Sequence, residues 1–153
     1  MQILLKDLIK EADKPAPLQI QVYCDMDGVL VNMDKGEPMS DAKVLWDFIK
    51  DNFKTPPAVI LSAGQGADIA QQKTAWIRKN IDPSVKVIIA SSDEPRSNKI
   101  IQSTGRVTHV LIDAVEDNIT KWNNQAAHRI GILHKNAASS INQLKAFLPK
   151  KSG

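Results

Sequence analysis

Residues 19–28 have the sequence QIQVYCDMDG, a short apolar stretch that ends in two acidic residues and a glycine. The first six residues, Gln19–Cys24, have the length and apolar character of a buried strand. Asp25 and Asp27 follow this strand directly. The segment therefore predicts a β-strand with two carboxylates at its carboxyl end.

Apolar segments of the same kind alternate with helical patterns along the rest of the chain. Further strands are expected at residues 58–61, 85–90, 107–112 and 129–133, and helices at 2–11, 44–49, 69–80, 97–103, 117–127 and 137–148. Unbroken Val, Ile and Leu runs are typical of strands that are buried on both faces. The alternation predicts an α/β fold of three layers, with a central parallel sheet of about five strands and right-handed crossovers.

Length and composition exclude several classes of protein. A chain of 153 residues predicts a single domain over residues 1–153, with residues 1–14 as an N-terminal helical extension. With 42% hydrophobic and 24% charged residues, the chain is neither disordered nor collagen-like. Cys24 is the only cysteine, which excludes an internal disulfide. Charged residues interrupt the first apolar stretch and no run approaches about 20 apolar residues, so we expect a soluble cytoplasmic protein with no membrane partner.

The charge is divided unevenly between the two halves of the chain. Residues 1–76 carry 8 basic and 11 acidic groups, whereas residues 77–153 carry 12 basic and 6 acidic groups. No acidic residue follows Asp117. This basic C-terminal part is either a solvated surface or a surface that attracts anions.

Polar side chains are expected at the carboxyl ends of the strands, the edge at which ligands bind in open α/β sheets. Asp25 and Asp27 follow the first strand, Ser62 ends the second, Lys99 comes after the third and Asp113 ends the fourth. Grouped carboxylates repel one another unless a cation lies among them, and oxygen ligands beside a phosphate favour Mg²⁺. A carboxylate can be the nucleophile in phosphoryl transfer, while a hydroxyl and a lysine hold the transferring group. These strand ends therefore predict phosphoryl-transfer chemistry with Mg²⁺.

The same residues resemble the four sequence motifs of the haloacid dehalogenase (HAD) superfamily of phosphatases. The stretch DMDGVLV at residues 25–31 is similar to the first motif, and Ser62 after Val59-Ile60-Leu61 to the second. Lys99 resembles the third motif, and Asp113 with Asp117 the fourth. The resemblance extends from residue 20 to about residue 133 and implies a Rossmann-like fold of the HAD type.

The resemblance implies a role for each matching residue. Asp25 would be the nucleophile, and Asp27 the general acid and base, whose backbone carbonyl would also reach the metal. Ser62 would hydrogen-bond the phosphoryl group and Lys99 would neutralise the intermediate. The implied Mg²⁺ ligands are Asp25, Asp27, Asp113 and Asp117, the last either alongside Asp113 or in its outer shell.

Two positions differ from the pattern of many relatives. Where they have two consecutive aspartates in the fourth motif, this chain has Asp113 followed by Ala114, although Asp117 fits another spacing that the family uses. Arg96, three residues before Lys99, is an alternative source of the cation in the third motif. A compact lysine ammonium suits a phosphoryl oxygen better, which favours Lys99.

The spacing of the motifs leaves no room for the cap domain that many HAD enzymes carry. Ser62 lies 35 positions after Asp27, and Lys99 lies 37 positions after Ser62. Single helices and strands account for both intervals, together with a small flap that the resemblance places at about residues 29–38. Within this family a site without a cap implies a large substrate, such as a polymer end or a phosphoprotein, or closure by another subunit of a homo-oligomer.

A second local resemblance concerns the substrate. Residues 73–79, KTAWIRK, are similar to a segment of 5'(3')-deoxyribonucleotidases and of phage-type polynucleotide phosphatase domains. The resemblance implies a nucleotide or a nucleic-acid terminal phosphate as the substrate. Lys73 could then reach a phosphate or a base, although most helix lysines are only solvated. The candidate substrate-binding residues are Ala63, Gly64, Lys73 and Arg96.

Other functions stay open beside a nucleotide phosphatase. The chain could act on phosphoproteins or other small phosphate esters, or be a catalytically weak HAD-fold protein that binds nucleic acid through its basic C-terminal part. A phospho-acceptor switch that resembles response-regulator receivers is a further alternative. The order of the motifs argues against it, because a receiver has its acceptor aspartate on the third strand, where this chain has Ala90-Ser91-Ser92.

Overall fold

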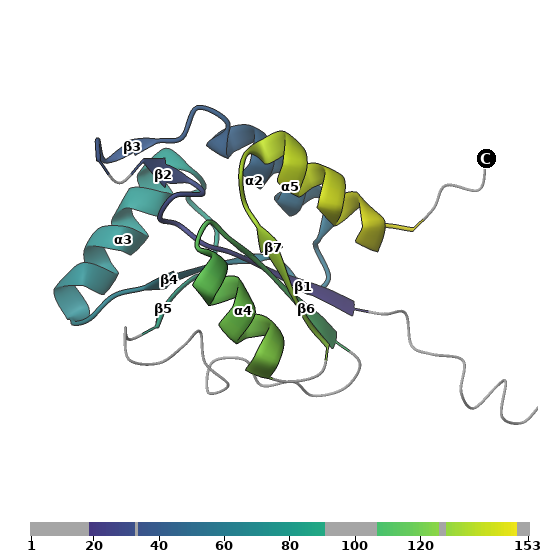
Figure 1. The fold of residues 1–153 in the computed structure, drawn as a ribbon. Coiled ribbons are helices and arrows are strands. Elements are labelled where there is room, and N and C mark those ends of the chain that lie inside the picture. The colour runs from purple at the N-terminus through teal and green to yellow at the C-terminus, as the bar shows by residue number, and fades with distance from the viewer. Residues whose placement is uncertain (1–18, 33, 91–106, 126–127, 150–153) are drawn as a thin grey trace, which may run out of the picture.

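A five-stranded parallel sheet forms the centre of the computed structural model, which describes residues 19–32, 34–90, 107–125 and 128–149 (Figure 1). The strand order is β5-β4-β1-β6-β7, with the N-terminal strand in the middle. The strands are β1 (Gln19–Cys24), β4 (Val59–Ala63), β5 (Val87–Ala90), β6 (Val107–Asp113) and β7 (Arg129–Leu133). The predicted α/β class with a parallel sheet of five strands is confirmed, and the strand order is compatible with a Rossmann-like fold.

Helices cover both faces of this sheet (Figure 1). They are α2 (Ala42–Asn52), α3 (Ala67–Asn80), α4 (Glu116–Gln125) and α5 (Ala137–Leu144), the last continued by the 3₁₀ turn η1 (Lys145–Phe147). Helices α2, α3 and α5 contribute to one core with one face of the sheet, and α4 packs on the other face. The helices expected at 2–11 and 97–103 lie outside the described residues.

Strand β1 shows why the sheet needs both layers. Its alternate side chains Val22 and Cys24 are buried in the core under α2 and α5, whereas Tyr23 is buried on the opposite side. On that side the Tyr23 hydroxyl lies 2.9 Å from His109 Nδ1, and the Tyr23 ring meets the Trp122 ring edge-on. A strand buried on both faces has no solvated side, which explains its unbroken apolar sequence.

A small hairpin lies between β1 and α2, beside α3 (Figure 1). It consists of β2 (Val31–Asn32) and β3 (Glu37–Pro38), which pair antiparallel. The hairpin occupies the interval that was expected to form the flap. Between Asp34 and Ala90 the chain forms the rest of the hairpin, α2, β4, α3 and β5. It contains no inserted domain in this interval.

None of the described helices is both long and apolar enough to span a membrane.

Candidate active site

The ends of β1 and β6 bring two buried carboxylates to the same edge of the sheet. The two strands are neighbours, with Cys24 opposite Ile112, and the Asp25 amide continues the pairing by donating to the Ile112 carbonyl over 2.9 Å. Asp25 is 2% exposed and Asp113 is fully buried. Their position at adjacent strand ends agrees with the expectation that ligands bind at this edge.

Cys24 lies inside the sheet beside these carboxylates and has no reactive role. Burial raises the pKa of the Cys24 thiol well above its usual value, and the negative charges of Asp25 and Asp113 raise it further. The thiol therefore stays protonated and behaves as a small apolar side chain.

Asp113 is held in place by the first turn of α4. The Val115 amide donates to its Oδ1 over 2.8 Å, and Asn118 Nδ2 donates to its Oδ2 over 3.1 Å. Asn118 was not predicted as a site residue, although its position in the first turn of the following helix is a usable signal. The expected partner Asp117 is instead 69% exposed and forms an ion pair with Lys121 over 2.9 Å.

Lys73 on α3 reaches across to the ends of β1 and β4. Its Nζ lies 3.0 Å from Asp27 Oδ2 and 3.0 Å from Ser62 Oγ, and it donates to the Ala63 carbonyl over 2.6 Å. Ser62 is fully buried, and its hydroxyl is in contact with this amine. Lys73 therefore belongs to the candidate site, in a more central place than the sequence indicated.

The turn after Ser62 places α3 for this contact. The Gly64 amide donates to the Ala90 carbonyl over 2.8 Å, which extends the pairing of β4 with β5, so this amide has a partner within the sheet. Gly66 has a φ of 89° and directly precedes Ala67, the first residue of α3. A left-handed conformation there is open to glycine at little cost. Lys99 and Arg96, the expected sources of the cation, lie outside the described residues.

The chain turns sharply at Gly28, directly after Asp27. Gly28 has a φ of 81°, and its amide donates to the Val31 carbonyl over 2.9 Å, which closes the base of the hairpin. A Cβ placed on Gly28 would lie 3.1 Å from the Cβ of Ala114. The small side chain of Ala114 is thus packed closely against this turn.

The hairpin is attached to α3 at its tip. Trp76 Nε1 donates to the Gly36 carbonyl over 3.0 Å. Trp76 lies less than one helical turn from Lys73, so the residue that holds the hairpin and the residue that reaches Asp27 belong to the same part of α3.

The basic C-terminal part offers fewer free cations than its sequence indicates. Lys121 is paired with Asp117, and the Arg129 guanidinium is buried over the Trp122 ring, 4.9 Å from its centre, with a hydrogen bond to Gln125. Lys135 and Lys145 are exposed. Among the described residues from Asp117 onward, this arrangement is a solvated surface with separate charges.

Only a few carboxylates at the described strand ends are placed to bind a hard cation. In the described part of the chain, no group of three or more His, Cys, Asp or Glu side chains is arranged to hold a metal ion. Two buried carboxylates from adjacent strands are nevertheless a fitting donor set for Mg²⁺, which usually takes one or two carboxylates and completes its shell with water and phosphate oxygens.

Comparison of the chain with protein-family models, with curated proteins and with solved structures gave no match. The function must therefore be argued from the residues and their geometry.

Proposed function

We propose that the chain is a Mg²⁺-dependent phosphomonoesterase of the HAD type that acts through an aspartyl-phosphate on a nucleotide or a nucleic-acid terminal phosphate. The position of Lys73 carries the proposal, because its Nζ lies 3.0 Å from both the Asp27 carboxylate and the Ser62 hydroxyl. Asp25, two residues before Asp27, lies at the same edge of the sheet. A cation and a hydroxyl beside a carboxylate nucleophile are what a transferring phosphoryl group requires.

In the first step a carboxylate oxygen of Asp25 attacks the phosphorus of the substrate. A bond forms between that oxygen and phosphorus while the bond from phosphorus to the ester oxygen breaks. Asp27, which is protonated once the bound phosphoryl group has taken the Lys73 amine from it, gives its proton to the departing oxygen, so the product leaves as a neutral alcohol. The phosphoryl group is then carried by Asp25.

In the second step a water molecule attacks the phosphorus of this intermediate. Asp27, now a carboxylate, takes a proton from the water as the bond between phosphorus and Asp25 breaks. Inorganic phosphate leaves, Asp25 is again a carboxylate and Asp27 is again protonated. The same side chain thus serves as acid and then as base.

Lys73 and Ser62 hold the phosphoryl oxygens during both steps. Without substrate, the Lys73 amine donates to the Asp27 carboxylate, the Ser62 hydroxyl and the Ala63 carbonyl. A bound phosphoryl group presents oxygens of the same kind, to which this amine and the Ser62 hydroxyl can donate. The family resemblance assigns the cation to Lys99, and the contacts of Lys73 support a role for this second amine.

Asp25 and Asp113 would hold Mg²⁺, together with the backbone carbonyl of Asp27. When bound, Mg²⁺ neutralises the charge that develops on the phosphoryl oxygens. Hydrogen bonds from Val115 and Asn118 fix the Asp113 carboxylate in one orientation, as supporting residues of metal ligands commonly do. Asp117, which is turned to Lys121, is better placed outside the first coordination shell.

Replacement of the nucleophile tests the mechanism. Asp25→Asn should lower the Mg²⁺-dependent hydrolysis of p-nitrophenyl phosphate by at least about a thousandfold, because an amide cannot form the covalent intermediate. Asp47→Asn is the matched control, since Asp47 is a half-exposed member of a surface ion pair with Lys43. Turnover by Asp25→Asn at the wild-type rate would overturn the mechanism.

The proposed substrate class rests on the open site and on the resemblance of residues 73–79. The interval from Asp34 to Ala90 builds no cap over the strand ends. A panel of mononucleotides, oligonucleotides with 3'- or 5'-phosphate ends and phosphopeptides, compared by kcat/KM, separates the candidates. Preference for phosphopeptides would contradict the nucleotide assignment, and tight oligonucleotide binding without phosphate release would indicate a binding protein instead.

A further inference from the structure

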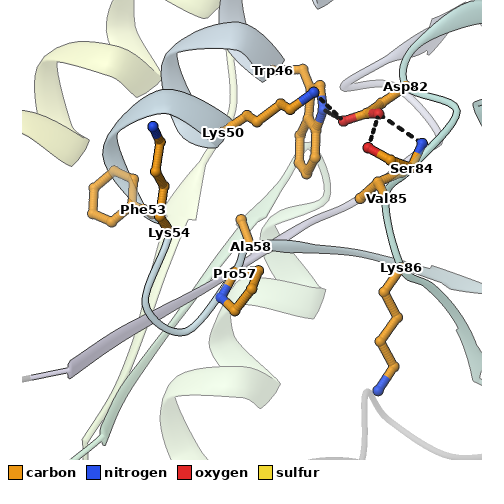
Figure 2. A pocket seen from close by; sticks show the side chains of 10 residues that line it. All are labelled: Trp46, Lys50, Phe53, Lys54, Pro57, Ala58, Asp82, Ser84, Val85 and Lys86. Atoms are coloured by element: carbon orange, nitrogen blue, oxygen red, sulfur yellow. Dashed lines mark hydrogen bonds and ion pairs between the residues drawn. The ribbon is translucent and has the colours of Figure 1, made fainter.

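A pocket, called the second pocket because it is distinct from the candidate active site, lies at the opposite edge of the sheet from that site. It has a volume of about 450 Å³ and is formed by the C-terminal half of α2, the segment between α2 and β4 and the loop that precedes β5 (Figure 2). Ala58 comes directly before β4 and Lys86 directly before β5. Because the strands are parallel, these amino ends lie a full strand length from the ends that carry Asp25 and Ser62. The pocket is therefore a separate feature of the molecule.

The inner surface of this pocket is apolar. Phe53, Ala58 and Val85 line it and are each less than 9% exposed. They belong to the core under α2, so their positions are set by packing that does not depend on a ligand. A pocket of this volume with a preformed apolar floor is of the size that small ligands occupy.

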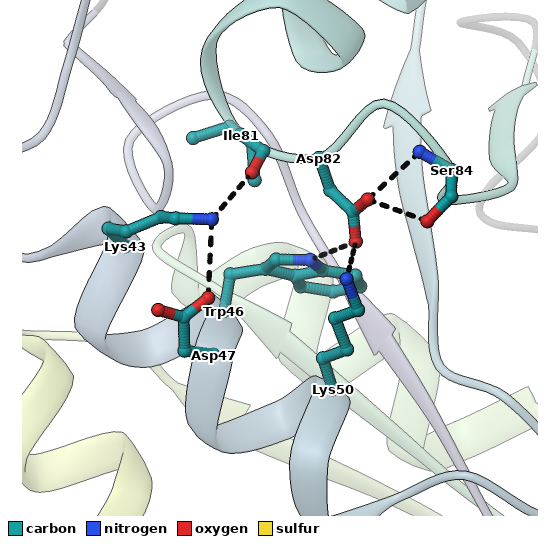
Figure 3. A network of polar contacts seen from close by, with 7 residues as sticks. All are labelled: Lys43, Trp46, Asp47, Lys50, Ile81, Asp82 and Ser84. Carbon is teal, nitrogen blue, oxygen red and sulfur yellow. Dashed lines mark hydrogen bonds and ion pairs between the residues drawn. The ribbon is translucent and has the colours of Figure 1, made fainter.

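Asp82 is the one carboxylate among the lining residues, and both of its oxygens form hydrogen bonds or ion pairs with neighbouring residues (Figure 3). Asp82 Oδ2 accepts from Trp46 Nε1 over 2.9 Å and pairs with Lys50 Nζ at 3.2 Å, while Oδ1 accepts from the Ser84 amide and hydroxyl. These four contacts fix the wall between α2 and the loop after α3. They also offset the negative charge that would otherwise repel an anion.

Two further lysines at the pocket have no such partner. The side-chain amines of Lys54 and Lys86 form no hydrogen bond or ion pair with the described residues, and both side chains are exposed. Figure 2 shows Lys54 beside Phe53 and Lys86 on the opposite side of the pocket, with its side chain extending away from Ala58 and Val85. With Lys50 compensated by Asp82, the pocket carries an excess positive charge at its rim and apolar groups on its floor.

We propose that this pocket is a binding site for a small organic anion, with an apolar ring or short chain that lies on Phe53, Ala58 and Val85 and an acidic group that is attracted by the excess positive charge of the rim, to which Lys54 and Lys86 contribute from opposite sides. The apolar floor supplies affinity by removing hydrocarbon surface from water. The two amines select a negative charge, and their exposure keeps this selection modest and dependent on salt.

Naphthalene-2-sulfonate is a suitable probe, because it is an anionic apolar ring that no phosphatase can hydrolyse. Each of the three tryptophan indole N–H groups has a different partner, so their ¹H–¹⁵N signals report separate parts of the molecule. Trp46 donates to Asp82 in the pocket wall, Trp76 to Gly36 at the hairpin and Trp122 to His109 under α4. Each signal can be assigned by a Trp→Phe replacement.

Titration with the probe should move the Trp46 signal in a saturable way, with a dissociation constant of about 1 mM or tighter for a ligand of this size, while the Trp122 signal stays in place. The uncharged naphthalene-2-sulfonamide should bind several-fold more weakly. The double variant Lys54→Ala/Lys86→Ala should weaken sulfonate binding by about tenfold, and Lys145→Ala, which removes an exposed lysine elsewhere, should bind like the wild type.

Three results would overturn the proposal: an unmoved Trp46 signal, equal affinity for sulfonate and sulfonamide, or undiminished binding by the double variant. Movement of the Trp76 signal alone would place the anion at the candidate phosphate site and would overturn it as well. None of these readouts uses phosphatase activity, so the test is independent of the proposed function.

Discussion

Lys73 joins groups that come from three separate elements. Its amine on α3 meets a carboxylate that follows β1 and a hydroxyl in β4, so the contact exists only in the folded chain. The sequence places Lys73 on a helix, where most lysines are solvated, and this is why it was expected only as a candidate substrate-binding residue, while Lys99 was expected to supply the cation. Two glycines in the turn before α3 bring the helix back over the strand ends, an effect that residue spacing alone does not reveal.

Removal of this amine should therefore impair the proposed reaction strongly. Lys73→Ala should lower kcat/KM for p-nitrophenyl phosphate by about a hundredfold or more, which is typical for the loss of one donor to a developing oxyanion. Lys99→Ala should change it by less than about fivefold. Lys79→Ala is the control for a lysine on the same helix. If Lys99→Ala lowered kcat/KM as much as Lys73→Ala or more, the cation would be supplied by Lys99 of the third motif.

The fourth motif contains a second contact that the spacing of single residues in the sequence could not predict. Asp113 was predicted correctly at the end of its strand, and the structure places it beside Asp25. Asp117 and Asn118 are neighbours in α4, but consecutive helix residues point about 100° apart, so only one of them can face Asp113. Asn118 does, over 3.1 Å. Sequence spacing could not decide this, because both residues lie within reach of the strand end.

At the scale of the elements, the strands were predictable because burial on both faces leaves an unbroken apolar sequence. β1 and β7 have the expected boundaries, whereas β5 begins at Val87 instead of Val85. Val85 is buried in the loop that Asp82 and Ser84 close, so its apolar character reflects the core and not the strand. Helix α5 was expected to reach Leu148 but ends at Leu144 and continues as a 3₁₀ turn.

A hydrogen bond from α3 contributes to the position of the hairpin between β1 and α2. Trp76→Phe keeps the ring but removes the hydrogen bond to the Gly36 carbonyl, which is worth about 1 kcal/mol. Hydrogen exchange of the Gly28 and Gly36 amides, which pair within the hairpin, should accelerate by about fivefold. Trp122→Phe removes a similar bond on the other face of the sheet and should leave these amides unchanged. Unaltered exchange in Trp76→Phe would show that the hairpin is held by other contacts.

At the scale of the whole molecule, the two edges of the sheet carry opposite chemistry. The carboxyl edge gathers Asp25, Asp27 and Asp113, which favour a cation, and the amino edge gathers the lysines of the second pocket, which favour an anion. Helix α3 runs between them, with Lys73 at one edge and the Ile81-Asp82 segment directly after its last residue at the other. The contacts of Asp82 therefore contribute to the stability of the layer that positions the candidate site.

Asp82 should make this stability depend on pH. Burial by itself would raise the pKa of Asp82, but hydrogen bonds from Trp46, Ser84 and Lys50 outweigh it and hold the pKa well below its usual range. A lowered folded-state pKa means that the stabilisation is present above the unfolded value of about 3.9 and is lost as the pH falls through the folded value.

Asp82→Asn should thus lower the free energy of unfolding by about 2 kcal/mol at pH 7. The difference in this free energy between the variant and the wild type should become smaller below about pH 4. Urea unfolding of both proteins between pH 7 and pH 2.5 measures this difference, with Asp47→Asn as the exposed ion-pair control. Other carboxylates titrate equally in both proteins, so a difference that stays constant over this range would contradict the assigned role of the Asp82 charge.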